Sequence, residues 1–196
     1  MKYNYLNVIG LMTGTSIDGI DISLVKTNGI NIQRSNKNYY YRYSDKTKYI
    51  LLDILKQDIN DNLKRKDLLD KIITEEHFNA LKESGLLEQS SLIGFHGQTI
   101  YHNPKEKVSI QLGAPLKLAK LCKKDVIFGF RDKDINNGGE GAPLAPIYHK
   151  LIIEDLNLGL PSCILNIGGV ANLSYWDGNN LIGFDTGPGN ALMDNH

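Results

Sequence analysis

The chain has 196 residues, of which 41% are hydrophobic and 22% charged, and its formal net charge at neutral pH is zero. This composition is typical of a globular protein, long enough for one sizeable core or two small ones. The lack of a basic excess argues against a nucleic-acid partner, and the longest apolar runs are too short to cross a bilayer. The N-terminus lacks the apolar core of a signal peptide, so we expect a cytoplasmic protein with no membrane partner.

The two cysteines, Cys122 and Cys163, do not have the spacing of metal ligands. In a cytoplasmic protein this pattern predicts two buried, reduced thiols.

The first segment has the pattern of a three-stranded antiparallel meander. Residues 5–12 form an apolar run typical of a strand that is buried on both faces. After a polar turn at 13–19, apolar and polar residues alternate over 20–24, which predicts a half-buried strand. Asn28-Gly29 is a strong hairpin signal, so a third strand is expected within residues 30–43.

Helical and strand patterns alternate over the middle of the chain. Asp67 is the expected N-cap of the longest helix, and Pro115 suits the first turn of a later helix. The expected elements are, in chain order, helices at 49–55 and 68–81, a strand at 91–95, a helix from 115, a strand at 126–128, a polar loop at 132–141 and a helix over 144–152.

A second hairpin is expected after Pro161. Its first two strands are separated by a Gly168-Gly169 turn, and a third short strand at 181–184 leads into a Gly/Pro loop at 185–190 and a helix from Ala191. Both hairpins have the order apolar strand, small-residue turn, strand. Two such hairpins are the phosphate-binding device of the superfamily that contains sugar kinases, actin and heat-shock ATPases, so the pattern favours an α/β fold of that kind.

The turn at 13–19 carries groups that suit a nucleotide phosphate. Its glycines allow close approach of the backbone, and its hydroxyls add hydrogen-bond donors. Asp18 or Asp21 would orient a hydrated magnesium ion. An ordinary hairpin turn is the alternative, and the Walker pattern with its lysine is missing.

Three further segments hold candidate ligand-binding groups. His96 and Gln98 follow a predicted strand, a common place for ligand contacts, although a core histidine is the simpler explanation. Arg131 opens the polar loop and suits a carboxylate, and a mobile linker is the alternative. Asp185 is expected at a strand end, where a carboxylate can act as a general base. Helix capping by Asp185 or Asn190 is the alternative there.

Five blocks of this sequence together resemble the anhydro-N-acetylmuramic acid kinase family of bacterial cell-wall recycling. They occur in the order that the family has. The blocks are GLMTGTSIDGID at 10–21, GFHGQTIYHNP at 94–104, GFRDKDINNGGEGAPLAPIYHK at 129–150, ILNIGGVANLSYW at 164–176 and GFDTGPGNALMD at 183–194.

The resemblance implies an α/β, two-domain sugar-kinase/actin-like ATPase fold. Residues 1–158 would form the N-terminal phosphate-loop and sugar-binding domain, and residues 159–196 would begin a second ATPase-type domain. Family members are substantially longer than this chain, so the second domain is expected to be incomplete.

The resemblance also implies an ATP-dependent kinase with Mg²⁺ as its metal. The enzyme would open the 1,6-anhydro bridge of anhydro-N-acetylmuramic acid with water and phosphorylate the 6-oxygen of the sugar, in peptidoglycan recycling and amino sugar metabolism. Asp185 matches the general base that activates the water. The residues matching the ATP phosphate loop are Gly14, Thr15, Ser16, Ile17, Asp18, Gly19, Ile20 and Asp21.

The sugar is expected to contact His96, Gln98, Arg131 and Asn190, and no metal site made of protein ligands alone is expected. A homodimer is a further expectation. The alternative function is that of a truncated, catalytically inactive remnant or sugar-binding module of the same family.

Overall fold

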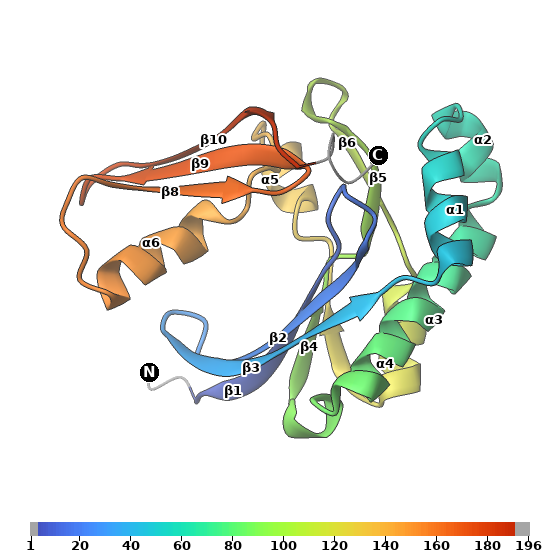
Figure 1. Ribbon diagram of the computed structural model, residues 1–196, viewed down its shortest axis with the longest axis horizontal. Helices are drawn as coiled ribbons and strands as arrows, with labels where there is room; N and C mark the ends of the chain where they lie inside the picture. Colours follow the sequence, from blue (N-terminus) through green and yellow to red (C-terminus); the bar gives the residue numbers. More distant parts are fainter. Residues whose placement is uncertain (1–3, 191–196) are drawn as a thin grey trace. The chain divides into compact units, whose positions relative to one another are not determined.

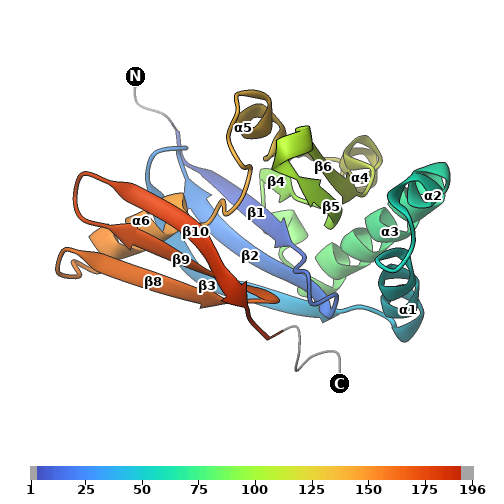
Figure 2. The same ribbon diagram turned by 90° about the horizontal axis from the view of Figure 1, so that it is seen from above.

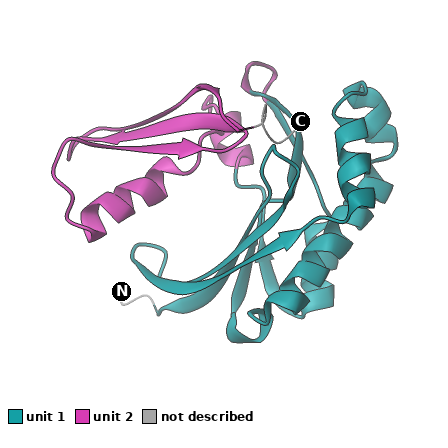
Figure 3. Cartoon of the chain, in the orientation of Figure 1, with its two compact units in different colours: residues 1–103, 108–130 teal, residues 104–107, 131–196 magenta. Residues whose placement is uncertain are grey.

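The computed structural model of the chain describes residues 4–190, and the helix expected from Ala191 lies outside this range. The chain separates into two compact units, coloured in Figure 3. Unit 1 comprises residues 1–103 and 108–130, and unit 2 comprises residues 104–107 and 131–196. The domain boundary expected after residue 158 therefore falls inside unit 2, and the division into functional domains stays a prediction.

A five-stranded mixed sheet forms the centre of unit 1, with the strand order β3-β2-β1-β4-β7. Strands β1 to β3 form the antiparallel meander expected from the sequence, and β4 lies beside β1 (Figure 2). Strand β4 pairs in parallel with both β1 and β7. The mixed α/β architecture is the expected fold class. The strands are β1 (Leu6–Met12), β2 (Gly19–Thr27), β3 (Ile32–Arg42), β4 (Leu92–Phe95) and β7 (Asp125–Ile127).

The hairpin between β2 and β3 forms where Asn28-Gly29 predicts it. The side-chain oxygen of Asn28 accepts hydrogen bonds from the backbone N–H of Ile30 and Asn31, at 3.0 and 2.8 Å. Gly29 has φ of +85°, a value that glycine adopts without steric cost. The turn chemistry of these two residues therefore fixes the register of the hairpin.

Strand β1 buries one face, so the expectation that both faces are buried is wrong. Ile9 and Leu11 are buried, whereas Leu6 and Met12 are 44% and 46% exposed. Successive side chains of a strand point to opposite faces, and the helices of unit 1 lie against one face of the sheet (Figure 1). Side chains of β1 are therefore buried on the face that the helices cover and exposed on the other face.

Four helices and a two-stranded hairpin complete unit 1. Helix α3 begins directly after α2, and its N-cap residue is Arg65 rather than the expected Asp67. The Arg65 carbonyl accepts hydrogen bonds from the backbone of Leu68 and Leu69, so this junction leaves Asp67 inside the first turn. The elements are α1 (Asp45–Ile54), α2 (Ile59–Lys64), α3 (Lys66–Ser84), α4 (Pro115–Cys122), β5 (Gln98–Asn103) and β6 (Val108–Leu112), with a short 3₁₀ turn at Leu87–Gln89. The residues between β5 and β6, which include a 3₁₀ turn at Pro104–Glu106, are assigned to unit 2.

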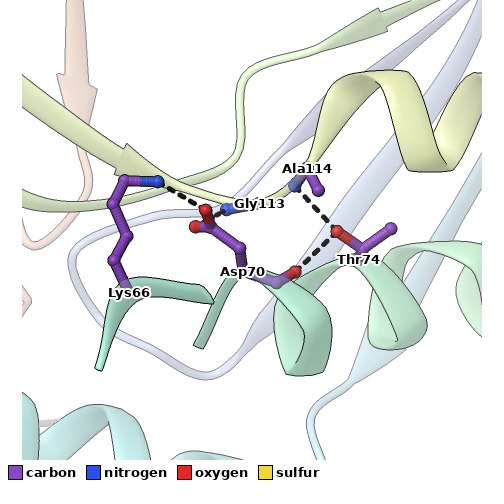
Figure 4. A network of polar contacts seen from close by, with 5 residues as sticks. All are labelled: Lys66, Asp70, Thr74, Gly113 and Ala114. Atoms are coloured by element: carbon purple, nitrogen blue, oxygen red, sulfur yellow. Dashed lines mark hydrogen bonds and ion pairs between the residues drawn. The ribbon is translucent and has the colours of Figure 1, made fainter. Parts of the chain in front are cut away.

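Helix α3 satisfies the N-terminal backbone groups of α4, whose own N-cap residue, Ala114, has no side chain for the task (Figure 4). The carboxylate of Asp70 accepts a hydrogen bond from Gly113 N at 2.8 Å, and the hydroxyl of Thr74 accepts one from Ala114 N at 2.8 Å. Lys66 forms an ion pair with Asp70 at 2.5 Å. These contacts attach α4 to α3, since a helix start needs partners for its first N–H groups.

One continuous hydrophobic core lies in unit 1, between the sheet and its helices. Complete burial of each of its leucine or isoleucine side chains contributes roughly 1.5–3 kcal/mol relative to exposure. The fully buried large side chains are Ile9, Ile17, Ile20, Ile22, Leu51, Ile54, Leu69, Ile73, Leu81, Ile93, Leu112 and Leu118.

Unit 2 contains an antiparallel sheet with the order β10-β9-β8, and helix α6 lies against β9 and β10 (Figure 1). The segment expected as a polar loop contains a short helix, α5, and the last strand is longer than expected, so Asp185 lies within it rather than at its end. The elements are α5 (Asp132–Asn136), α6 (Pro146–Asp155), β8 (Ser162–Ile167), β9 (Val170–Trp176) and β10 (Leu181–Pro188).

The two thiols differ in their surroundings. Cys122 is buried, as expected, but Cys163 is exposed. Cys163 lies opposite Tyr175 in the sheet, on the other face from Ser174, and Ser174 is the residue that contacts helix α6 through His149. None of the helices within residues 4–190 has the length and apolarity needed to cross a membrane.

Candidate functional site

The phosphate-loop candidate connects the end of β1 to the start of β2, in unit 1. Ile17 is 2% exposed and has φ of +54°. A β-branched residue is rarely found in this conformation, which costs on the order of 1–3 kcal/mol and persists only where the surrounding structure fixes it. Burial of the Ile17 side chain in the core therefore anchors a strained loop.

Polar groups of the loop are available to a ligand. Among the residues that the structure describes, the backbone N–H groups of Thr15 and Ser16 meet no protein acceptor, whereas Ile17 N donates to Gly14 O at 3.4 Å. Successive N–H groups of this kind form an anion-binding concavity. The loop therefore fits a phosphate group by its own geometry.

The pKa values of two carboxylates at this loop, those of Asp18 and Asp21, are shifted in opposite directions. Burial acts to raise the pKa of Asp18, but hydrogen bonds from Ser16, Tyr40 and the backbone outweigh it and lower the pKa. The Tyr40 hydroxyl donates to Asp18 at 3.0 Å, and burial with this bond raises the pKa of Tyr40 to about 12. Burial and the Asp18 charge together raise the pKa of Asp21. A cation held near both carboxylates would relieve their repulsion.

Three buried side chains, those of Thr13, Tyr43 and Gln98, contact the loop or the segment beside it. The Thr13 hydroxyl donates to Gly97 O at 2.8 Å, and the Gln98 amide donates to Gly14 O at 3.1 Å. Tyr43 donates through its hydroxyl to the Gln98 side-chain oxygen at 3.4 Å and through its backbone N–H to Asp18 O at 3.1 Å. The parallel pairing of Leu11 with Phe95 brings Gly97 and Gln98 to the loop, because it places the chain after β4 beside the chain after β1. The antiparallel pairing of Gly19 with Arg42 brings Tyr43 to it from the end of β3.

His96 lies in this same region of unit 1, between β4 and β5. Its ring nitrogen Nδ1 lies 2.7 Å from Gly97 O, and the side chain is half-buried. The fully buried histidine of unit 1 is instead His77, on α3, which packs edge-on against Phe95 with 4.8 Å between the ring centroids. A half-buried ring at the end of a strand leaves His96 in a position from which it can reach a ligand.

In unit 2, Arg131 fixes the loop that precedes α6. Its Nη1 donates to Gly141 O at 2.6 Å, and Asp134 accepts a hydrogen bond from Gly141 N at 2.7 Å. Burial lowers the pKa of Arg131, and the Asp185 charge acts in the opposite direction. The structure therefore brings the charges of Arg131 and Asp185 together from distant parts of the sequence.

Asp185 belongs to a row of polar side chains across the sheet of unit 2. It is paired with Asn172 of β9, which is in turn paired with Asn166 of β8. Directly opposite residues of antiparallel strands have Cβ atoms about 5 Å apart on the same face. The row therefore places two amides beside the candidate base, and the buried Oδ1 of Asn172 has no hydrogen-bond partner among the described residues.

Asn190 follows β10 and contacts the turn between β8 and β9 in unit 2. Its backbone N–H donates to Gly168 O at 2.8 Å, in the turn between β8 and β9. Its side-chain Oδ1 is also buried and has no hydrogen-bond partner within residues 4–190. An unsatisfied buried acceptor is unusual in a native protein, and a sugar hydroxyl would satisfy it.

The predicted site residues thus gather into two groups, one within each unit. Residues 14–21 lie beside His96 and Gln98 in unit 1, and unit 2 contains Arg131, Asp185 and Asn190. Within residues 4–190, no cluster of three or more His, Cys, Asp or Glu side chains is suited to hold a metal ion.

Sequence reasoning missed several participants. Tyr40 and Tyr43 lie in a tyrosine-rich strand end that carries no motif, and only the sheet register reveals their contacts with the loop. Asn166 and Asn172 are paired because three residues, 168–170, separate the paired positions Ile167 and Ala171. A two-residue Gly168-Gly169 turn would have paired Asn166 with Ala171, so the sequence prediction did not reveal this pair.

The sequence model of the family described as "Anhydro-N-acetylmuramic acid kinase" matches residues 6–196. Curated relatives of that name include proteins from Pelagibacter ubique (40% identical, 95% of this chain and 52% of the relative), Rhodopseudomonas palustris strain BisB18 (39%, 96% and 55%) and Brucella suis (41%, 95% and 53%). The chain therefore spans about half the length of the curated relatives that it matches.

Proposed function

The chain belongs to the anhydro-N-acetylmuramic acid kinase family, and from this premise we propose that it takes part in the ATP-dependent hydrolysis and phosphorylation of 1,6-anhydro-N-acetylmuramic acid. The observation that carries the proposal is the match along residues 6–196, which includes both groups of candidate site residues. The reaction would belong to peptidoglycan recycling and amino sugar metabolism, in the cytoplasm. A homodimer and a sugar-binding domain over 1–158 are parts of the same proposal.

Residues 14–21 would hold the phosphates of ATP. The N–H groups of Thr15 and Ser16 would donate to phosphate oxygens, and Asp18 and Asp21 would orient a hydrated Mg²⁺ ion. When bound, ATP supplies the phosphoryl group that the 6-oxygen of the sugar accepts. The contribution of the loop is therefore positioning and charge neutralisation, which dominate catalysis of phosphoryl transfer.

Asp185 would act as the general base of the hydrolytic step. Its carboxylate takes a proton from water, the water oxygen bonds to the anomeric carbon, and the bond from that carbon to the 6-oxygen breaks. This is the geometry of an inverting glycosidase, in which a carboxylate activates water on the face opposite the leaving oxygen. Because Asp185 is exposed in the sheet of unit 2, water has access to it.

Binding of the sugar is assigned to His96, Arg131 and Asn190. The family resemblance also implies Gln98, whose amide donates to Gly14 O and accepts from the Tyr43 hydroxyl. Arg131 suits the carboxylate of the muramic acid, since guanidinium and carboxylate form paired hydrogen bonds. The unpartnered Oδ1 of Asn190 suits a sugar hydroxyl.

The test is turnover and binding by the purified protein. We expect ADP release that depends on the anhydro sugar, measured in a coupled assay, and sugar binding measured by calorimetry. Asp185→Asn should lower the rate about 10²- to 10⁴-fold, as loss of a general base does, with sugar affinity nearly unchanged.

Asp177→Asn is the matched control, because Asp177 lies in the turn between β9 and β10, where its carboxylate accepts hydrogen bonds from the backbone N–H groups of Asn179 and Asn180. Its rate should stay within twofold of the unmodified protein. Retained activity in Asp185→Asn would remove Asp185 as the base. Sugar binding with no ADP release from the unmodified protein would favour the alternative of a sugar-binding module.

A further inference from the structure

We propose that Gln98 is a positioning residue for the phosphate loop and acts on ATP binding through Gly14 rather than by contact with the sugar. The proposal rests on the proposed function in one respect, that residues 14–21 bind the phosphates of ATP. It differs from the assignment of Gln98 to the sugar pocket, and the two assignments predict opposite changes in ligand affinity.

Both ends of the Gln98 amide already have protein partners. The side chain is 1% exposed, its Nε2 donates to Gly14 O at 3.1 Å, and its Oε1 accepts from the Tyr43 hydroxyl at 3.4 Å. A backbone carbonyl can only accept, so the contact with Gly14 fixes which end of the amide faces the loop. To reach a sugar, Gln98 would have to give up hydrogen bonds in a buried place, which is unfavourable.

The carbonyl that Gln98 holds is the one that closes the loop. Gly14 O also accepts the backbone N–H of Ile17 at 3.4 Å, and Ile17 has the left-handed φ of +54°. A strained residue keeps its conformation only if neighbouring contacts fix it. Gln98 therefore fixes the orientation of the Gly14 carbonyl. That carbonyl closes the strained turn, and the N–H groups of Thr15 and Ser16 lie within this turn.

Two further hydrogen bonds attach the loop at its β1 end and at its β2 end. Thr13 donates to Gly97 O at 2.8 Å on the β1 side, and Tyr43 N donates to Asp18 O at 3.1 Å on the β2 side. Gln98 joins the two sides because it contacts both Gly14 and Tyr43. Such pre-organisation matters for phosphate binding, because donors must be in place before the ligand arrives.

The first experiment compares two glutamine variants. Gln98→Met keeps the length of the side chain and removes both hydrogen bonds. Gln111→Met is the matched control, since Gln111 lies in the same β5–β6 hairpin and its amide donates to the Thr99 and Ser109 hydroxyls, not to the loop. We expect Gln98→Met to weaken ATP binding about tenfold in calorimetry and to leave the affinity for the anhydro sugar within twofold. Gln111→Met should change neither affinity.

A second measurement does not depend on any ligand. Hydrogen exchange of the backbone amides in residues 14–19 should become at least about tenfold faster in Gln98→Met, with helix α3 unchanged. If Gln98→Met fails to fold, Thr13→Val replaces it, because it removes the Thr13–Gly97 contact at nearly constant volume. Thr74→Val, at a buried threonine on α3, is then the control.

Each outcome decides the proposal. Faster loop exchange together with selective loss of ATP affinity supports it. Loss of sugar affinity with ATP affinity retained, or loop exchange equal to that of the control variants, overturns it. Faster loop exchange in a protein that binds no ATP would uphold the positioning of the loop by Gln98 and count against the proposed function alone.

Discussion

At the scale of single residues, the two glycines of the phosphate loop have different amounts of space around them. A Cβ atom on Gly19 would lie 2.2 Å from the Tyr41 backbone oxygen and 2.9 Å from the Tyr40 ring. A Cβ atom on Gly14 would come within 3.1 Å of the Ser16 hydroxyl, which can rotate away. The close approach of β3 therefore requires glycine at the start of β2 but not at the start of the loop.

We therefore expect Gly19→Ala to lower the free energy of unfolding by about 3 kcal/mol, the upper range for overpacking, because a backbone atom cannot move aside. Gly14→Ala should change it by less than about 1 kcal/mol, since the loss of unfolded-state entropy offsets a small clash. Urea unfolding followed by circular dichroism measures both. Equal destabilisation of the two variants would contradict this account of the loop.

The carboxylates of the loop should respond to pH with opposite signs. The pKa of Asp18 is lowered in the folded state, so its stabilising contribution is present above the unfolded pKa and is lost as the pH falls through the folded pKa. The pKa of Asp21 is raised, so its contribution is present below the unfolded pKa and is lost as the pH rises through the folded pKa.

Asp18→Asn should therefore be less stable than the unmodified protein at pH 7, and Asp21→Asn more stable. Both differences should shrink as the pH falls toward about 3, where carboxylates protonate. Both side chains are exposed, so the effects are small, and the sign of the difference is the informative quantity. Urea midpoints at the two pH values are the measurement, and the same sign for both variants would refute the assignment.

At the scale of elements, helix α3 is held against the sheet by a buried histidine. Burial lowers the pKa of His77 to about 4, and its Nδ1 lies 2.7 Å from Ile73 O. In the unfolded chain His77 is therefore protonated below pH 6.5, whereas in the folded state it stays neutral until the pH falls to about 4. Stability is full above the unfolded pKa and is lost progressively across that window.

Lowering the pH from 7.5 to 5.5 should lower the free energy of unfolding of the unmodified protein by about 1.4 kcal/mol through His77. The reason is that pH 5.5 lies one unit below the unfolded pKa of histidine, and each such unit corresponds to about 1.4 kcal/mol. His77→Asn should remove this part of the pH dependence, although it lowers stability overall. His102→Asn is the control, because His102 is an exposed histidine of the β5–β6 hairpin. A pH dependence in His77→Asn as steep as that in His102→Asn would rule out His77 as its source.

At the scale of the whole molecule, the two units differ in the apolar surface that they bury. The continuous core belongs to unit 1, whereas in the described part of unit 2 the buried hydrophobic residues are Ile135, Ile153 and Trp176. One face of the β8–β10 sheet also exposes large apolar side chains, with Leu165 55% and Ile167 61% accessible. Because hydrophobic burial is the main source of stability, unit 2 should be the weaker of the two.

The single tryptophan makes this testable. Trp176 is 7% exposed in unit 2, with Lys150 Nζ 4.2 Å from its ring centroid. We expect the Trp176 fluorescence transition at a lower urea concentration than the transition in circular dichroism, which reports largely on the helices of unit 1. Coincident transitions would mean that the chain unfolds as one cooperative body. Leu165→Ser should reduce aggregation without moving either midpoint, since its side chain is already exposed.

Local sequence patterns were enough to predict the features that depend on neighbouring residues. The meander, the Asn28-Gly29 hairpin, the helix that begins at Pro115 and the second hairpin at Gly168-Gly169 all follow from alternation and turn chemistry within a few residues. The five blocks indicated the family from the residues alone. The candidate roles of Asp185, His96, Arg131 and Asn190 came from the same blocks and stay predictions.

Only the tertiary structure decided which candidate residues meet. The contacts of Thr13 with Gly97 and of Gln98 with Gly14 each join residues 84 positions apart, through the parallel pairing of β1 and β4. Parallel pairing joins segments that lie far apart along the chain, so local sequence patterns carry no record of its partners. The same reason explains why the one-sided burial of β1 differs from the sequence-based expectation, because the helices that cover its sheet come from later segments of the chain. Asp185 lies inside β10 because it pairs with Asn172 of the preceding strand, which extends β10 beyond its apolar residues.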